Sequence, residues 1–335
     1  MIKHLRKWLH SHDRLYYLYC FFRRFNQRQY FKVIKKFIES GDIFDKDVNF
    51  NENDSIIQSE AYPQGHYYSA IPDLSEIKND WQRVFHNNES LHEIDLNTNE
   101  QLLLLSQFRG YYSEQPFPEN KQSNSNIRYF FNNDEFSYMD ALVLYCMIRY
   151  FSPKRIIEIG CGFSSLVMLD TNSIFFDNKI NLTFIEPYPE RLLTNILPTD
   201  DINLIQSKVQ HVDVGVFEEL ERGDILFIDG SHVSKVGSDV HFLLFEVIPR
   251  LPDGVIIHFH DIFYPFEYPS NWIFEGRFWN ELYLLRAYLM FTNSIKIKFF
   301  NSYLSAKYTS EISEYMPMGL KNSGGSIWLE IDRSL

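Results

Sequence analysis

The chain has 335 residues, of which 45% are hydrophobic and 17% aromatic, a composition that excludes a wholly disordered protein and predicts one or two domains with a large core. Its formal net charge of -12 argues against a nucleic-acid partner, because surfaces that bind phosphate backbones are basic. The three cysteines never stand in CxxC spacing, which argues against a disulfide framework or a zinc knuckle and favours a reducing, cytoplasmic setting.

The first 40 residues form a segment that differs in charge from the rest of the chain. Residues 1–36 hold ten basic side chains against one acid, Asp13, which leaves a net charge of -21 for the remainder. Apolar and basic residues fall on opposite sides of a helical wheel, so we predict a basic amphipathic helical arm. Such an arm can lie on the inner face of an anionic membrane, or pack on its own protein or on a second copy in a homo-oligomer. No apolar run reaches the roughly 18 to 20 residues that cross a bilayer.

Residues 41–135 are predicted to be an accessory or lid region. Residues 40–60 and 113–127 are rich in Asn, Asp, Ser, Glu and Gln and lack a hydrophobic period, which indicates loops. Between them, residues 62–73 read YPQGHYYSAIPD. This irregular aromatic loop is interpreted either as part of a lid or acceptor wall, or as simple packing on the core.

From residue 136 to the C-terminus the pattern alternates between strands and helices. A continuous apolar helix is predicted over residues 137–150. Strands are predicted at 155–159, 181–186, 202–205, 224–229, 254–260, 294–300 and 325–330, with helices near 163–176, from 189, and at 214–221, 235–249 and 277–292. This alternation is typical of an α/β fold with a doubly wound, mostly parallel Rossmann-like sheet. Ligands of such sheets bind beyond the carboxyl ends of the strands.

The most informative motif is RIIEIGCGFSS at residues 155–165. Gly160 and Gly162 let the backbone turn sharply and approach a ligand, and the following helix offers unpaired N–H groups. The motif therefore predicts a cradle for a nucleotide-like cofactor. Ser165 stands where a dinucleotide fingerprint has its third glycine, which disfavours a nicotinamide-dependent oxidoreductase.

Acidic and histidine side chains follow the other predicted strands. Glu186 ends the second strand, where a carboxylate can accept both ribose hydroxyls. The segments ILFIDGSH and IIHFHDI place Asp229, His232, His260 and Asp261 at the ends of adjacent strands, and we interpret this group as the reaction centre. Carboxylate oxygens suit Mg²⁺, which lowers the pKa of a bound hydroxyl. A histidine suits general-base work because its pKa lies near neutrality.

The segments GCGFSS, IEPYP, FIDGSH and HFHDI resemble class I S-adenosylmethionine-dependent methyltransferases over roughly residues 136–331. Within that class the chain is similar to bacterial sugar and natural-product O-methyltransferases of the macrolide sugar methyltransferase type. The resemblance implies S-adenosylmethionine as cofactor, a small-molecule or glycan hydroxyl as acceptor, and an antiparallel last strand in a seven-stranded sheet. The cofactor-binding residues that it implies are Glu158, Gly160, Gly162, Ser164, Glu186 and Asp229. The catalytic residues are Asp229, His232, His260 and Asp261, with Asp229 and Asp261 as the ligands of Mg²⁺.

Three alternatives stay open at the level of sequence. The relatives usually carry a carboxylate immediately before the second aspartate, whereas this chain has His260, so metal-assisted catalysis competes with metal-free base catalysis by His260 or His232. Arg277, Trp279 and Asn280 either shape the acceptor pocket or serve as a helix cap and core. A non-catalytic protein that keeps the cofactor fold and binds a partner or a membrane is the alternative function.

Overall fold

The computed structural model describes residues 62–86, 91, 93–123 and 125–333. By its contacts the chain divides into a unit that ends at Asp73 and a unit that begins at Leu74. The predicted basic arm and its membrane contact lie outside the described residues, and the division of the chain at residues 40 and 135 stays a prediction. Within the described ranges, no helix is long and apolar enough to cross a membrane.

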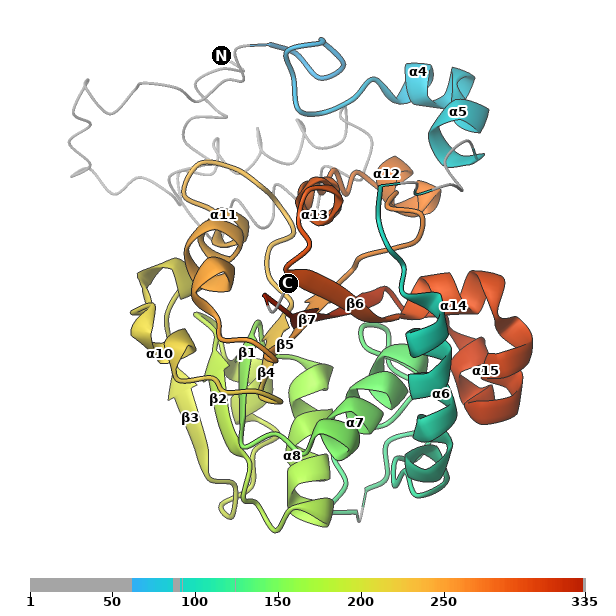
Figure 1. Cartoon of the computed structure of the whole chain (residues 1–335). Helices are drawn as coiled ribbons and strands as arrows, with labels where there is room; N and C mark the ends of the chain where they lie inside the picture. The colour runs from blue at the N-terminus through green and yellow to red at the C-terminus, as the bar shows by residue number, and fades with distance from the viewer. Residues whose placement is uncertain (1–61, 87–90, 92, 124, 334–335) are drawn as a thin grey trace, which may run out of the picture. The chain divides into compact units, whose positions relative to one another are not determined.

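The unit from Leu74 is built on one seven-stranded sheet in the order β3-β2-β1-β4-β5-β7-β6 (Figure 1). Its strands are β1 (Arg155–Ile159), β2 (Asn181–Ile185), β3 (Ile202–Ile205), β4 (Ile225–Ile228), β5 (Ile256–His260), β6 (Ile295–Phe300) and β7 (Ser326–Ile331). The pairs among β1 to β5 are parallel, and β7 runs antiparallel between β5 and β6. The predicted mostly parallel sheet with an antiparallel last strand is confirmed. Because the chain leaves β1 toward β2 but returns on its other side with β4, a crevice is expected between the carboxyl ends of these strands.

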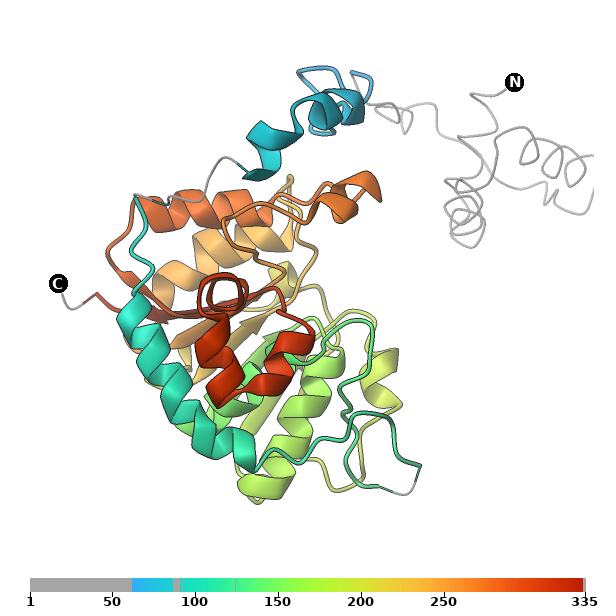
Figure 2. The same ribbon diagram turned by 90° about the vertical axis from the view of Figure 1, so that its right-hand side faces the viewer.

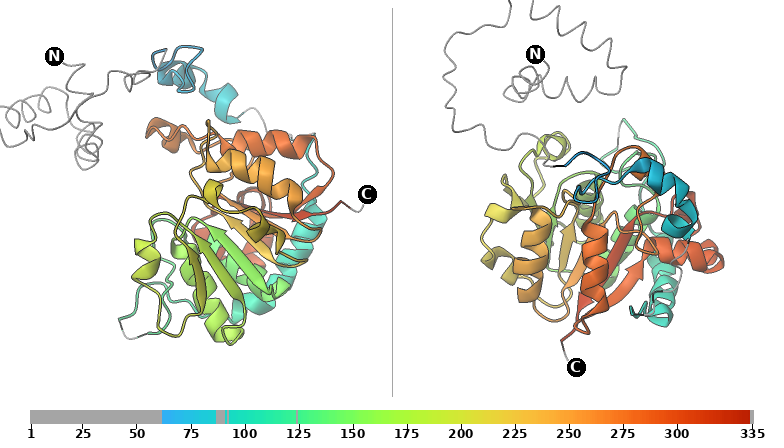
Figure 3. Two further views of the ribbon diagram at one scale, coloured as in Figure 1. Left: turned by 90° about the vertical axis from the view of Figure 1, so that its left-hand side faces the viewer. Right: turned by 90° about the horizontal axis from the view of Figure 1, so that it is seen from above.

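Helices cover both faces of the sheet. On one face α7 (Met139–Phe151) and α8 (Phe163–Phe175) pack together, and α6 (Thr98–Ser113) contacts α7, β6 and α15 (Thr309–Tyr315) (Figure 2). On the opposite face lie α11 (Asp239–Phe242) and α13 (Glu281–Met290), drawn in orange (Figure 3). The remaining α-helices are α4 (Leu74–Asn79), α5 (Trp81–His86), α9 (Glu190–Leu193), α10 (Gly215–Glu218), α12 (Ser270–Phe274) and α14 (Asn301–Lys307).

The hydrophobic core lies between the sheet and the helices that cover its two faces. All four residues of β4 are buried, as expected for a parallel strand that is covered on both faces. Helix α7 buries every residue from Met139 to Ile148, which explains why residues 137–150 read as one apolar run rather than as an amphipathic helix.

Two predicted helices begin later than expected. The helix predicted over 235–249 begins at Asp239, because Gly237 has a φ of 73° and Ser238 caps the helix by accepting a hydrogen bond from the His241 N–H. The helix predicted over 277–292 begins at Glu281, after Gly276 with a φ of 91° breaks it from α12. Both corrections leave irregular segments beside the carboxyl ends of β4 and β5.

Candidate active site

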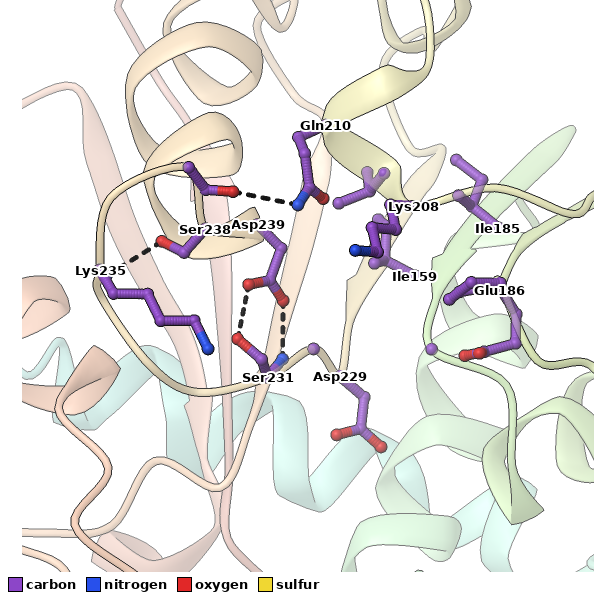
Figure 4. A pocket seen from close by; sticks show the side chains of 15 residues that line it. Ile159, Ile185, Glu186, Lys208, Gln210, Asp229, Ser231, Lys235, Ser238 and Asp239 are labelled. Carbon is purple, nitrogen blue, oxygen red and sulfur yellow. Dashed lines mark hydrogen bonds between the residues drawn. The ribbon is translucent and has the colours of Figure 1, made fainter. Parts of the chain in front are cut away.

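A cavity of about 390 Å³ opens beyond the carboxyl ends of β1, β2 and β4 (Figure 4). Gly160, Glu186 and Asp229 all line it, together with residues of the segments that follow β3 and β4. The crevice predicted from the strand order therefore exists, and three of the predicted cofactor residues open into it.

The glycine turn at the end of β1 is required by the packing of the strands. Gly160 has a φ of 83°, and a Cβ placed on it would lie 1.8 Å from the carbonyl oxygen of Asp229. The backbone at the end of β4 thus passes so close to residue 160 that no side chain fits there. Gly162 differs, because its nearest neighbour for an added Cβ is Arg191 Nη1 at 4.0 Å. The protein leaves open space beside this backbone, as a closely approaching ligand requires.

Glu158 and Ser164 lie behind the turn rather than on the cavity. Both are buried, and the Glu158 carboxylate accepts hydrogen bonds from the hydroxyls of Ser164 and Ser165, each at 2.5 Å. Burial raises the pKa of Glu158 to about 8, and the two hydroxyls only partly offset it. This arrangement ties the first turn of α8 to β1, and it gives Ser165 a structural role in the place of a third glycine. Direct cofactor contact by Glu158 or Ser164 stays a prediction.

Glu186 faces the glycine turn across the cavity. Its carboxylate accepts a hydrogen bond from the Cys161 N–H at 3.3 Å and another from the Tyr188 N–H at 2.8 Å. A carboxylate offers about four acceptor sites, so oxygen lone pairs remain for the hydroxyls of a ligand. Figure 4 shows the side chain at the edge of the cavity.

The far wall of the cavity is the loop after β4, which sequence reasoning did not single out. Asp239 accepts hydrogen bonds from the Ser231 N–H at 2.7 Å and from its hydroxyl at 2.5 Å. The Gln210 side chain donates to the Gly237 carbonyl at 3.1 Å, which links this loop to the segment after β3 (Figure 4). Asp239 begins a helix, and that position alone indicates nothing beyond a favourable charge at a helix N-terminus.

The predicted reaction centre is a connected cluster around His232. The Nε2 atom of His232 lies 3.3 Å from Asp229 Oδ1 and 3.5 Å from Asp261 Oδ2. Its Nδ1 atom lies 2.9 Å from Glu281 Oε2, a buried carboxylate that sequence reasoning missed. His232 and Asp261 both have a φ of 57°, a conformation that non-glycine residues adopt rarely and mostly where the surrounding structure requires it.

His260 lies on the other side of Asp261. Its Nε2 atom is 3.5 Å from Asp261 Oδ1, and its Nδ1 atom is 3.4 Å from the hydroxyl of Ser326 on β7. That hydroxyl in turn donates to Asp140 of α7 at 2.5 Å. The structure thus brings the four predicted catalytic residues together, with the two imidazoles flanking one carboxylate; their roles in catalysis stay predictions.

Neighbouring charges set the protonation of this cluster. Burial disfavours a charged His232, but hydrogen bonds and charges from Asp229 and Glu281 outweigh it and raise the pKa well above its usual value. The pKa of His260 is also raised, because Asp261 and Asp229 outweigh its burial. For Asp229, burial is outweighed by the two histidines and the pKa is lowered, whereas burial dominates at Asp261 and raises it. The raised pKa favours the protonated form of the His232 imidazole, which lies between the two aspartates.

The predicted Mg²⁺ site does not fit this donor set. Within the residues that the structure describes, no group of three or more His, Cys, Asp or Glu side chains is arranged to hold a metal ion. The space between Asp229 and Asp261 is taken by His232 Nε2, so the two carboxylates face an imidazole nitrogen rather than an open site. A Mg²⁺ site at Asp229 and Asp261 is therefore not supported by this donor set, and the choice between metal-assisted and metal-free base catalysis stays a prediction.

The segment before α13 is anchored to the reaction centre. The N–H groups of Asn280 and Glu281 both donate to the His232 carbonyl at 3.1 Å, and the Asn280 side chain accepts from the Ser234 N–H at 2.6 Å. The Trp279 ring lies 4.5 Å from the His232 ring. Glu281 could not be recognised from sequence, because an acid in the first turn of a helix is common without any further role.

Comparisons with known proteins agree with this geometry. Residues 157–262 match the protein family described as a methyltransferase domain. An uncharacterized protein of Archaeoglobus fulgidus is 40% identical over 168 residues, which cover 49% of this chain and 76% of that protein.

Two solved structures illustrate the remote similarities. The plantazolicin methyltransferase BpumL, in complex with a monoazolic desmethylPZN analog and SAH, is 15% identical with a TM-score of 0.39, over 71% of this chain and 98% of that one. The O-methyltransferase TomG from Streptomyces achromogenes, in complex with SAM, is 10% identical with a TM-score of 0.35, over 77% of this chain and 96% of that one.

Proposed function

We propose that this chain, which belongs to one family with the Archaeoglobus fulgidus protein and has the class I S-adenosylmethionine-dependent methyltransferase fold, methylates a hydroxyl of a sugar or another small molecule. The observation that carries the proposal is the single cavity into which Gly160, Glu186 and Asp229 open. His232 adjoins that cavity through Asp229. A cofactor site and a proton acceptor therefore meet at one end of the sheet.

The cavity supplies the contacts that the cofactor needs. Glu186 would accept the ribose hydroxyls, and the turn at Gly160 and the open backbone at Gly162 would lie against the methionine part. When bound, S-adenosylmethionine supplies a methyl group on a positively charged sulfur. At Asp229 the two histidines outweigh burial and lower the pKa, so its carboxylate would present a negative charge to the cationic cofactor. The remaining task of the protein is to orient the acceptor oxygen in line and to remove its proton.

His232 is the group that takes the proton. Glu281 holds its Nδ1 atom, so Nε2 points to the two aspartates, much as the carboxylate of a catalytic triad orients its histidine. Asp229 and Glu281 raise the pKa of His232. A cationic cofactor near Asp229 would lower the pKa of His232 again and so favour its action as a base. Nε2 of His232 would hold the proton that the acceptor hydroxyl loses, and bound S-adenosylmethionine would supply the methyl group to the acceptor oxygen.

The test incubates the full-length protein with methyl-labelled S-adenosylmethionine and fractionated small metabolites and glycans, and follows the label. We expect transfer by the native protein and a loss of about 10²- to 10⁴-fold for His232→Asn, with affinity for S-adenosylhomocysteine within about twofold by calorimetry. His211→Asn, at an exposed histidine that does not line the cavity, serves as the matched control. Cofactor binding without transfer to any fraction would instead support the non-catalytic alternative, and a fully active His232→Asn variant would exclude His232 as the base.

A further inference from the structure

An aromatic corner with one cation adjoins the reaction centre. Trp272 and Trp279 meet edge to face at 5.3 Å, and the guanidinium carbon of Arg277 lies 4.6 Å from the Trp272 ring centre and 5.7 Å from that of Trp279. The ring centres of Trp279 and His232 are 4.5 Å apart, so the aromatic corner lies directly beside the proposed base. Trp272 and Trp279 are both partly exposed.

The backbone holds this corner in place. After α12, Gly276 turns the chain, and the Arg277 N–H donates to the Trp272 carbonyl at 2.9 Å. The next turn is fixed by the bond from the Asn280 N–H to the His232 carbonyl. Main-chain hydrogen bonds thus fix the backbone of this segment at both of its ends.

Arg277 has the capacity to bind an anion at this corner. Its side chain is 43% exposed and lies 3.3 Å from Glu275, whose side chain is 51% exposed. An ion pair between two such exposed groups contributes little. The guanidinium carries five N–H donors in a planar fork that matches a carboxylate, and stacking on indole rings orients it.

We propose that the acceptor carries a carboxylate, which Arg277 binds, and a ring whose face packs against Trp279. The inference rests on the proposed function, whose acceptor class it narrows. A uronic acid and a phenolic acid share this chemistry, since each combines a hydroxyl-bearing ring with a carboxylate. The cation at Arg277 also selects against neutral competitors, because charge-assisted hydrogen bonds to a carboxylate are the stronger ones.

The experiment measures binding to the full chain saturated with S-adenosylhomocysteine, by calorimetry, with two matched pairs of probes. Methyl glucuronoside is compared with methyl glucoside, and 3,4-dihydroxybenzoate with catechol. We expect the carboxylated member of at least one pair to bind about tenfold or more tightly than its neutral partner. The pair that shows this preference, called the responding pair, tells whether the acceptor resembles a uronic acid or a phenolic acid. Arg277→Gln should reduce that preference to about one, whereas Arg222→Gln, which removes an exposed charge near the opposite end of β4, should keep it. Trp279→Leu should weaken both members of the responding pair.

Equal binding within both pairs, no binding of either carboxylated probe, or a preference that survives Arg277→Gln would overturn the inference. A parallel assay with labelled S-adenosylmethionine separates it from the proposed function. Binding of a carboxylated probe together with an absence of transfer to any acceptor contradicts the methyltransferase proposal alone. Transfer to neutral and carboxylated acceptors with equal efficiency contradicts the role of Arg277 alone.

Discussion

Replacing Gly160 with alanine tests whether the turn between β1 and α8 holds both the sheet and the cofactor site. The added Cβ would lie 1.8 Å from the Asp229 carbonyl oxygen, and real Cβ contacts are essentially never shorter than 3.0 Å. The ends of β1 and β4 must therefore separate by roughly 1.2 Å, the difference between these two distances. A left-handed backbone adds about 1 to 2 kcal/mol for a residue with a Cβ. With the strain of the displaced strand end, we expect a loss of about 3 kcal/mol or more in the free energy of unfolding.

The measurement combines thermal unfolding with calorimetric titration of S-adenosylhomocysteine. A loss of about 3 kcal/mol lowers the melting temperature by roughly 6 to 12 °C in a domain of this size, and the shifted Asp229 should abolish measurable binding. Gly162→Ala is the matched control, because its Cβ meets nothing closer than 4.0 Å; we expect it to unfold within about 1 kcal/mol of the native protein. A Gly160→Ala variant with native stability and native affinity would refute the close approach of the two strands.

Two further predictions concern the carboxylates that hold the site. Glu186→Ala should weaken binding of S-adenosylhomocysteine by about tenfold or more, because we propose that its acceptor oxygens bind the ribose hydroxyls. Calorimetry measures this affinity. Thermal unfolding should change little, since within the described residues the side chain accepts hydrogen bonds from the N–H groups of Cys161 and Tyr188 alone. Glu281→Gln should lower the pKa of His232 and reduce the maximal rate by about 10- to 100-fold. In a pH–rate profile, the lower pKa should move the acidic limb to lower pH. Since the pKa of His232 is raised on folding, its pairing stabilises the protein fully below the unfolded pKa of about 6.5 and this contribution is lost as the pH rises through the folded pKa. As the pH rises above about 6.5, the melting temperature of the native protein should accordingly fall more than that of His232→Gln, and parallel curves would contradict the shift.

Local patterns in the sequence predicted the seven strands and the residues Gly160, Glu186 and Asp229 that line one cavity, but not the helices α6, α12, α14 and α15. Hydrophobic runs of the right length gave the seven strands, because a strand that is covered on both faces carries few polar residues. The glycine turn and Glu186 were predictable because their positions follow from strand ends and from the order of a doubly wound sheet. The largest delays, of four residues each, are in the two helices that follow Gly237 and Gly276, because the conformation of a turn can be set by a single residue.

Tertiary packing alone decided the chemistry of the reaction centre. The partner of His232 is 49 residues away in the chain, and the hydroxyl beside His260 comes from the last strand and meets an aspartate 186 residues earlier. Whether two aspartates hold a metal or an imidazole depends on which side chain fills the space between them, and nothing in the spacing of DGSH and HFHD fixes that. A sequence pattern is local, whereas the charge and the donors around a buried group are set by segments that only the packed fold brings together.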